Sequence, residues 1–135
     1  MLPSGLPEQI RDEEDLARFL TSSSHLSAVM VKPAAFLPRP DNPETSVFRH
    51  GADVWEDLWA LAREHIGAAR NLHGVAILIA RDVRATGLDA VSSEPPPRHA
   101  NITGWASHPD DADLARARRK EQALSLAQQA KLIRR

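Results

Sequence analysis

The sequence predicts a single α+β domain with one mixed β-sheet of about four or five strands, a tryptophan-bearing amphipathic helix on one face, and a long C-terminal helix. Apolar residues recur at 3- and 4-residue steps over residues 53–71, as on one face of a helix. Residues 72–80 are almost continuously apolar from Val75 onward, which is typical of a strand buried on both faces. The alternation of helical and strand-like segments is too irregular for a doubly wound sheet.

The N-terminal third predicts one helix and two strands. Residues 12–21 form the expected helix, because Asp12 is a good N-cap and the acidic first turn suits the helix dipole. Residues 25–38 resemble a strand interrupted by Pro33, which cannot donate to a ladder. Residues 45–50 (TSVFRH) resemble a short strand with alternating faces.

The middle of the chain contains the clearest helix. Asp53 and Glu56 have the spacing of a capping box. One continuous face then follows, made of Trp55, Leu58, Trp59, Ala62, His65, Ile66 and Ala69. This face predicts that the two tryptophans pack in the core and that His65 is a core or boundary residue.

The C-terminal half predicts a short helix over 82–86, a strand over 88–91, a last strand over 100–105 and a helix over 111–133. The prolines at 95–97 form a stiff arm that leads into the last strand. Trp105, at the end of that strand, could be partly exposed and stack on a ligand. The final helix has only a narrow, alanine-rich apolar stripe, which suits shallow packing on the sheet or contact with another chain.

The domain boundaries follow from this order. Residues 1–135 form one domain, residues 1–11 are expected to be flexible, and residues 110–135 form a C-terminal helix that can act as an assembly element. Seven of the 17 basic residues lie between Arg116 and Arg135, opposite in charge to the acidic residues 12–15. The expected partner is another protein chain or a second copy. Nucleic acid is a weaker candidate, because the net charge is −1.

Composition points to a bacterial protein of the cytoplasm. The chain has no cysteine, so disulfides and thiolate zinc sites are excluded. Arginine far outnumbers lysine and alanine is abundant, as in proteins from GC-rich bacterial genomes. The chain has neither a signal-like start nor an apolar run of the roughly 18–20 residues that span a membrane, so no membrane partner is expected.

The common catalytic and nucleotide-binding motifs are missing from the sequence. It contains no phosphate-binding loop, GxGxxG, GxSxG, HExxH or CxxC pair. Polar residues instead flank the predicted strands, where binding and catalytic side chains often lie. If these ends converge, they form a pocket lined by His25, Glu44, Arg49, His73, Arg98, His99 and Asn101.

Each of these side chains can have a purely structural role, and two functions remain open for the set. The first is a binding or accessory protein that uses the polar pocket for a ligand or partner and the C-terminal helix for assembly. The second is a small hydrolase or transferase for a phosphorylated or nucleotide substrate. In it, His99, His73 and Glu44 are catalytic, Arg98 and Arg49 clamp an anion, and Asn101 and His25 bind the ligand. The sequence leaves the cofactor unknown and assigns no metal site, but a metal, if one binds, would take His25, His73, His99 and Glu44.

Overall fold

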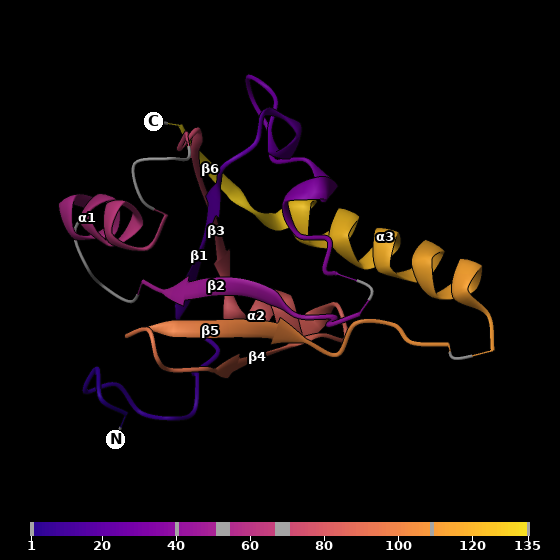
Figure 1. Cartoon of the computed structure of the whole chain (residues 1–135), viewed down its shortest axis with the longest axis horizontal. Coiled ribbons are helices and arrows are strands. Elements are labelled where there is room, and N and C mark those ends of the chain that lie inside the picture. Colours follow the sequence, from indigo (N-terminus) through magenta and orange to yellow (C-terminus); the bar gives the residue numbers. More distant parts are fainter. Residues whose placement is uncertain (1, 40, 51–54, 67–70, 109, 135) are drawn as a thin grey trace.

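The computed structural model describes residues 2–39, 41–50, 55–66, 71–108 and 110–134. In this part of the chain, six strands form one antiparallel sheet in the order β4-β5-β2-β1-β3-β6 (Figure 1). The strands are β1 Asp15–Leu20, β2 Thr45–Arg49, β3 Gly74–Ile79, β4 Asp89–Ser92, β5 His99–Thr103 and β6 Lys131–Arg134. The helices are α1 Trp55–Ile66, α2 Ala80–Ala85 and α3 Ala112–Gln129, with 3₁₀ turns at Ser23–His25 and Pro33–Ala35.

The sheet separates two apolar clusters. The larger cluster lies between the sheet and α2, α3 and the segment around Phe36, with Leu16, Leu78 and Leu126 at its centre. The smaller cluster lies on the other face, where α1 contributes Ala62. Figure 1 shows α1 and α3 on opposite sides of the β1–β3–β6 part of the sheet. None of the described helices has the length and apolarity needed to cross a membrane.

The predicted helix over residues 12–21 is wrong, because this segment contains β1, a central strand between β2 and β3. Leu16 and Leu20 are buried in the larger cluster, whereas Ala17 and Phe19 are buried in the smaller one. A helix could not bury both pairs against the two faces of the same sheet, so tertiary packing overrides the local capping signals.

The helix around the tryptophans is confirmed as α1. Trp59 and Leu61 pack beside Ala62 against the smaller cluster, which includes Phe19 and Val75. This is the predicted helix packed on one sheet face. Asp53 of the expected capping box and the side chains of Glu56, Trp55 and His65 lie outside the described residues.

The sheet differs from the prediction in strand count and direction. It has six strands rather than four or five, and the pairs are antiparallel rather than mixed. One additional strand is β1. The other is β6, because α3 ends at Gln129 and the chain then pairs with β3 instead of continuing as a helix to residue 133.

The other predicted segments agree with the structure in part. The predicted strands 45–50, 72–80 and 88–91 and the short helix near 82–86 are confirmed as β2, β3, β4 and α2. The predicted strand over 25–38 is instead two 3₁₀ turns and one isolated bridge between Leu26 and Val31. Residues 2–11 run beside β4 and the end of β2, with Ser4 bound to Glu94. Their flexibility stays a prediction.

Arg49 joins the N-terminal segment to the sheet. Its side chain is 1% exposed, and its Nε and Nη2 atoms donate to the two Glu14 carboxylate oxygens at 2.8 and 2.7 Å. Nη1 donates to the Pro7 carbonyl at 2.6 Å and to Ser92 Oγ at 3.2 Å. Ser92 Oγ in turn donates to the Glu8 carbonyl. One guanidinium therefore connects β2, β4, the start of β1 and residues 7–8.

Replacing Arg49 by alanine should lower the free energy of unfolding by about 3–5 kcal/mol, because it breaks an ion pair whose guanidinium is buried and leaves the half-buried Glu14 carboxylate without its partner. Chemical denaturation of the two proteins measures this difference. Arg84→Ala is the matched control, since its pairs with Asp12 and Asp89 are exposed and each contributes about 0–1 kcal/mol. Equal losses in the two variants would contradict a central role for Arg49.

Candidate functional site

The predicted site residues lie in three separate places. Glu44, His99 and Asn101 lie on the β2–β5 part of the sheet. Arg49 is in the interior. His73 lies near His25, next to the first residue of β3. The structure therefore does not gather the seven residues into one pocket.

On the β2–β5 part of the sheet, His99 makes a close polar contact with Ser46, a residue that was not predicted. Ser46 Oγ lies 2.6 Å from His99 Nε2, and His99 Nδ1 lies 2.9 Å from the Ser93 carbonyl oxygen. A carbonyl can only accept, so Nδ1 carries the proton in this contact. In the neutral ring, Nε2 is then the acceptor, and the Ser46 hydroxyl donates to it.

Two strands and one hairpin position this pair. Phe48 is directly opposite His99 in the β2–β5 register, and Ser46 is opposite Asn101, so all four side chains project from the same face. The β4–β5 hairpin returns Ser93 to His99, where the Ser93 N–H also donates to the His99 carbonyl at 2.9 Å. The imidazole lies edge-on to the Phe48 ring at 5.4 Å between centroids. Its orientation is therefore determined from three sides.

Asn101 and Glu44 extend the same polar face. Asn101 Nδ2 donates to Glu44 Oε2 at 3.1 Å. Ser46, His99 and Asn101 are each half-buried, so this face is partly open to solvent. Sequence analysis identified His99, Glu44 and Asn101 but missed Ser46, because a serine inside a strand has no motif around it.

The two predicted anion-binding arginines have defined structural contacts. Arg49 is buried, and four hydrogen bonds to Glu14, Pro7 and Ser92 use most of its donors. It has no exposed face with which to clamp a ligand. Arg98 has a left-handed backbone with φ of 70°, and its carbonyl accepts from the Arg49 N–H at 2.8 Å. A ligand role for Arg98 stays a prediction.

His25 and His73 lie far from His99. The β5, β2, β1 and β3 strands are successive neighbours, so β3 is three strand spacings, about 14 Å, from β5. The described residues contain no group of three or more histidine, aspartate or glutamate side chains that could hold a metal ion. The set of His25, His73, His99 and Glu44 therefore cannot share one metal in this arrangement.

His25 has an unusual environment of its own. Burial lowers its pKa from the ordinary value of 6.5, and the nearby Arg18 and His73 lower it further. Its Nδ1 atom is buried and has no hydrogen-bond partner within the described part of the chain. The neutral ring is therefore favoured here.

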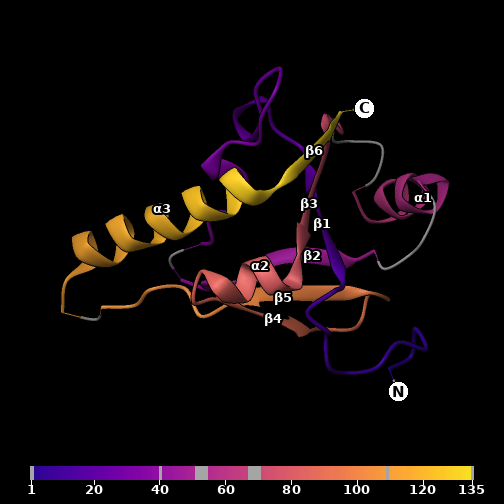
Figure 2. The same cartoon turned by 180° about the vertical axis from the view of Figure 1, so that it is seen from behind.

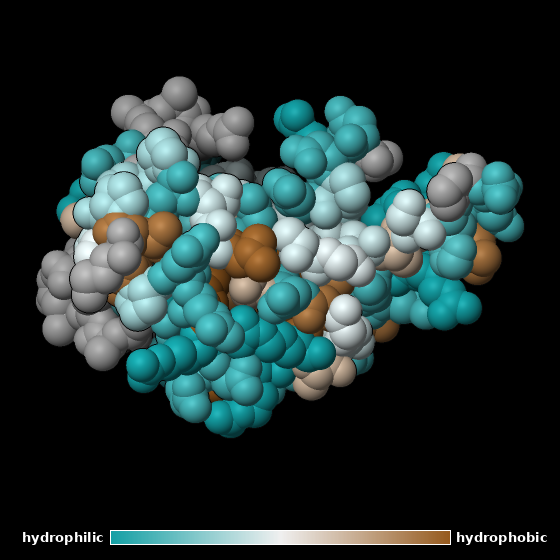
Figure 3. Space-filling view, turned by 90° about the horizontal axis from the view of Figure 1, so that it is seen from below, coloured by the Kyte–Doolittle hydropathy of each residue, from teal (hydrophilic) through white to brown (hydrophobic). Residues whose placement is uncertain are grey.

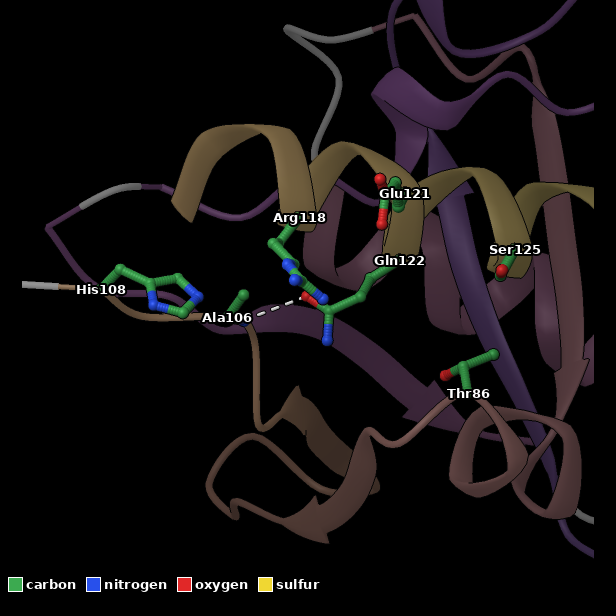
Figure 4. A pocket seen from close by; sticks show the side chains of 7 residues that line it. All are labelled: Thr86, Ala106, His108, Arg118, Glu121, Gln122 and Ser125. Carbon is green, nitrogen blue, oxygen red and sulfur yellow. Dashed lines mark hydrogen bonds between the residues drawn. The ribbon is translucent and has the colours of Figure 1, made fainter. Parts of the chain in front are cut away.

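Sequence reasoning also missed a polar pocket of about 440 Å³ beside α3. Figure 4 shows its lining side chains, with His108 and Arg118 near one end and Thr86 and Ser125 near the other. Gln122 Oε1 accepts from the Ala106 N–H at 3.0 Å, and this hydrogen bond joins two of the lining residues. Arg118 and Glu121 both line the pocket, so it favours neither an anion nor a cation.

Two further grooves lie beside β6, one on each face of the sheet. The first, of about 310 Å³, is lined by Trp59, Arg63, Leu72 and Arg134. The second, of about 430 Å³, lies between α3 and the segment before Pro33, and Met30, Leu124, Ala130 and Leu132 are among its lining residues. Trp59 and Leu72 pack on the smaller apolar cluster, whereas Ala130 and Leu132 pack on the larger one.

Trp105 is not available for stacking on a ligand. It is 5% exposed, packs in the larger cluster, and donates from Nε1 to the Ile102 carbonyl at 3.1 Å.

Comparison with known proteins gives no family assignment. No protein-family model matches the chain, and no curated protein or solved structure shows significant similarity to it.

The lowered pKa of His25 predicts acid sensitivity. An unfolded histidine binds a proton more readily than folded His25, so its contribution to stability is present above about pH 6.5 and is lost as the pH falls below that value. The free energy of unfolding should therefore fall less between pH 7 and pH 5 in His25→Gln than in the unmodified protein. Denaturant titrations across this range measure the slope, and the same titrations above pH 7 provide the control. If the free energy of unfolding changed with pH equally in the two proteins, His25 would not be a source of the acid sensitivity.

Proposed function

We propose that the protein is a small protein-binding module that takes up an extended segment of a partner along the open edge of β6. The observation that carries the proposal is an edge strand with a groove on each face of the sheet beside it. This retains the assembly role expected of the C-terminal region, but moves it from a helix to the strand that follows the helix.

The edge of β6 offers backbone hydrogen-bonding groups. β6 pairs with β3 through residues 131–134 and is the last strand of the sheet on that side. In an antiparallel edge strand, every second residue turns both its N–H and its C=O away from its neighbour. No helix or strand of the described chain crosses the outer side of β6 in Figure 2. These groups can therefore pair with an added strand.

The two grooves would receive the side chains of that strand. Successive side chains of an added strand point to opposite faces of the sheet, and specificity in strand addition comes from pockets for them. On one face the pocket has Trp59 and Leu72 as its apolar walls. On the other face the walls include Met30 and Leu124, which are 58% and 45% exposed. An incoming segment with apolar residues on both faces would cover these surfaces.

Charge narrows the partner to an acidic segment. Arg63 and Arg134 line the first groove, Lys32 lines the second, and Lys131 begins β6. The described linings of both grooves contain no aspartate or glutamate. A second copy fits less well, because antiparallel pairing of two β6 strands would place Lys131 opposite Arg134 of the other copy.

The face of the molecule seen in Figure 3 does not offer a continuous apolar docking surface. In the view of Figure 3, hydrophobic residues form small separate groups among hydrophilic ones rather than one continuous patch. The grooves beside β6, in contrast, combine apolar walls with the open edge of a strand.

Selection from a phage library of random short peptides should enrich acidic sequences with alternating apolar residues. The double variant Lys131→Glu, Arg134→Glu should lose at least about tenfold in affinity for a selected peptide, measured by fluorescence anisotropy, because two favourable charge contacts become repulsive. Arg116→Glu is the matched control, since Arg116 is exposed on α3 away from β6 and its affinity change should be small.

A peptide with N-methylated amides along one edge separates strand addition from adsorption by charge. It keeps its charges but cannot form the backbone ladder, so it should not bind. Equal binding of methylated and unmethylated peptides would contradict strand addition. The proposal of an acidic partner would be contradicted if the selected peptides were not enriched in acidic residues. It would also be contradicted if a second copy of the protein displaced the peptide by forming a dimer.

A further inference from the structure

We infer that Ser46 is a nucleophile activated by His99, and that this face of the sheet accepts a short acyl group from an ester or thioester. The site is independent of β6, and nothing in the binding function proposed above requires it. It differs from the hydrolase or transferase expected from the sequence in its catalytic residues and its substrate class, because that function used His73 and Glu44 beside His99 and a phosphorylated or nucleotide substrate.

The contacts form a continuous relay. Ser46 Oγ, His99 Nε2, His99 Nδ1 and the Ser93 carbonyl oxygen lie in that order, with contacts of 2.6 and 2.9 Å. A nucleophile within hydrogen-bond reach of a base, and a base oriented by a third group, is the general signature of an activated serine. Here the Ser93 carbonyl takes the orienting position that a carboxylate has in many such sites.

The surroundings are those of a site open to a substrate. Ser46 and His99 are half-buried. They lie on the same face as Phe48, which contacts His99 and packs in the smaller apolar cluster under α1. The Ser46 hydroxyl is therefore accessible from the solvent side while it stays in contact with His99 Nε2.

Asn101 supplies the donor that acyl transfer needs. It lies directly opposite Ser46 in the β2–β5 register. Its side-chain amide has two N–H donors, and one of them donates to Glu44 Oε2 at 3.1 Å. Glu44 thereby positions the amide, and the second N–H can stabilise the oxyanion that develops on the substrate carbonyl.

The reaction proceeds in two balanced steps. Ser46 Oγ attacks the carbonyl carbon and its proton moves to His99 Nε2. The tetrahedral intermediate then expels the alcohol or thiol, which takes that proton, and leaves an acyl ester on Ser46. Water attacks this ester, gives one proton to Nε2, and releases the carboxylic acid as Ser46 Oγ regains the proton. No oxidant, reductant or metal takes part.

A short acyl group suits the partly exposed position of the site. Ser46 and His99 are each half-buried, so the hydroxyl can be approached from the solvent side. A small acyl group, or one presented on an exposed end of a larger molecule, can reach Ser46 without entering a cavity.

A fluorophosphonate probe tests the nucleophile directly, because it forms a stable covalent bond to activated serines. Intact-mass analysis and peptide mapping should place one label on Ser46. Ser46→Ala should abolish labelling, and His99→Gln should slow it by about 10²–10⁴-fold, the usual contribution of a general base. Ser125→Ala, a serine on α3 remote from His99, should label at the unmodified rate.

Hydrolysis of p-nitrophenyl acetate tests the acyl step. The protein should release a burst of p-nitrophenol that is absent in Ser46→Ala, and Asn101→Ala should slow the burst by about 10²–10³-fold, as for loss of one oxyanion donor. Circular dichroism establishes that each variant is folded. Labelling spread over several serines, labelling insensitive to His99→Gln, or no burst in the folded protein would overturn the inference.

Discussion

Arg49 ends β2 inside the protein, where its charge is tolerated only because Glu14 and the Pro7 carbonyl lie within hydrogen-bond reach. Burial of an unpaired guanidinium would cost several kcal/mol, so these groups must be in place for the sheet to close in this form. The residues before β1 therefore belong to the same polar network as β2 and β4. This network also places the Arg98 carbonyl on the Arg49 N–H, directly before His99.

The alternation of side chains along β2 places the structural polar residue and the candidate functional one on opposite faces of the sheet. Alternation sends Arg49 and Val47 to the face of the larger apolar cluster and Ser46 and Phe48 to the opposite face. Arg49, which in the sequence resembles an anion-binding residue, is thus buried and pairs with Glu14. A serine that carries no motif is instead placed beside a histidine. Residue type alone does not distinguish these two outcomes, whereas the face on which each residue lies does.

The parts of the fold that the sequence predicts well are those with a strong local period. α1 has a continuous apolar face, and β3 is an unbroken apolar run. β1 and β6 were missed because their form depends on neighbours distant in sequence. Asp12 looks like an N-cap and Glu14 like part of an acidic first turn, but they pair with Arg84 and Arg49. The candidate site was predicted in part for the same reason, since His99 and Asn101 stand out in sequence but the Ser46 contact requires the β2–β5 register.

Most pairings in this sheet join segments more than 50 residues apart, such as Leu20 with Gly74, Thr45 with Ile102, and Val75 with Ile133. The exceptions among the strand pairs are the β4–β5 hairpin and the β1–β2 pair, in which Leu16 lies opposite Arg49. Each distant pairing pays its loop-closure entropy before its contacts form, and chains of this kind fold slowly. Until β3 receives β6, the buried run from Val75 to Leu78 has one uncovered side. This topology is therefore most prone to misassociation during folding, while β3 is still unpaired on one side, and not after the sheet is complete.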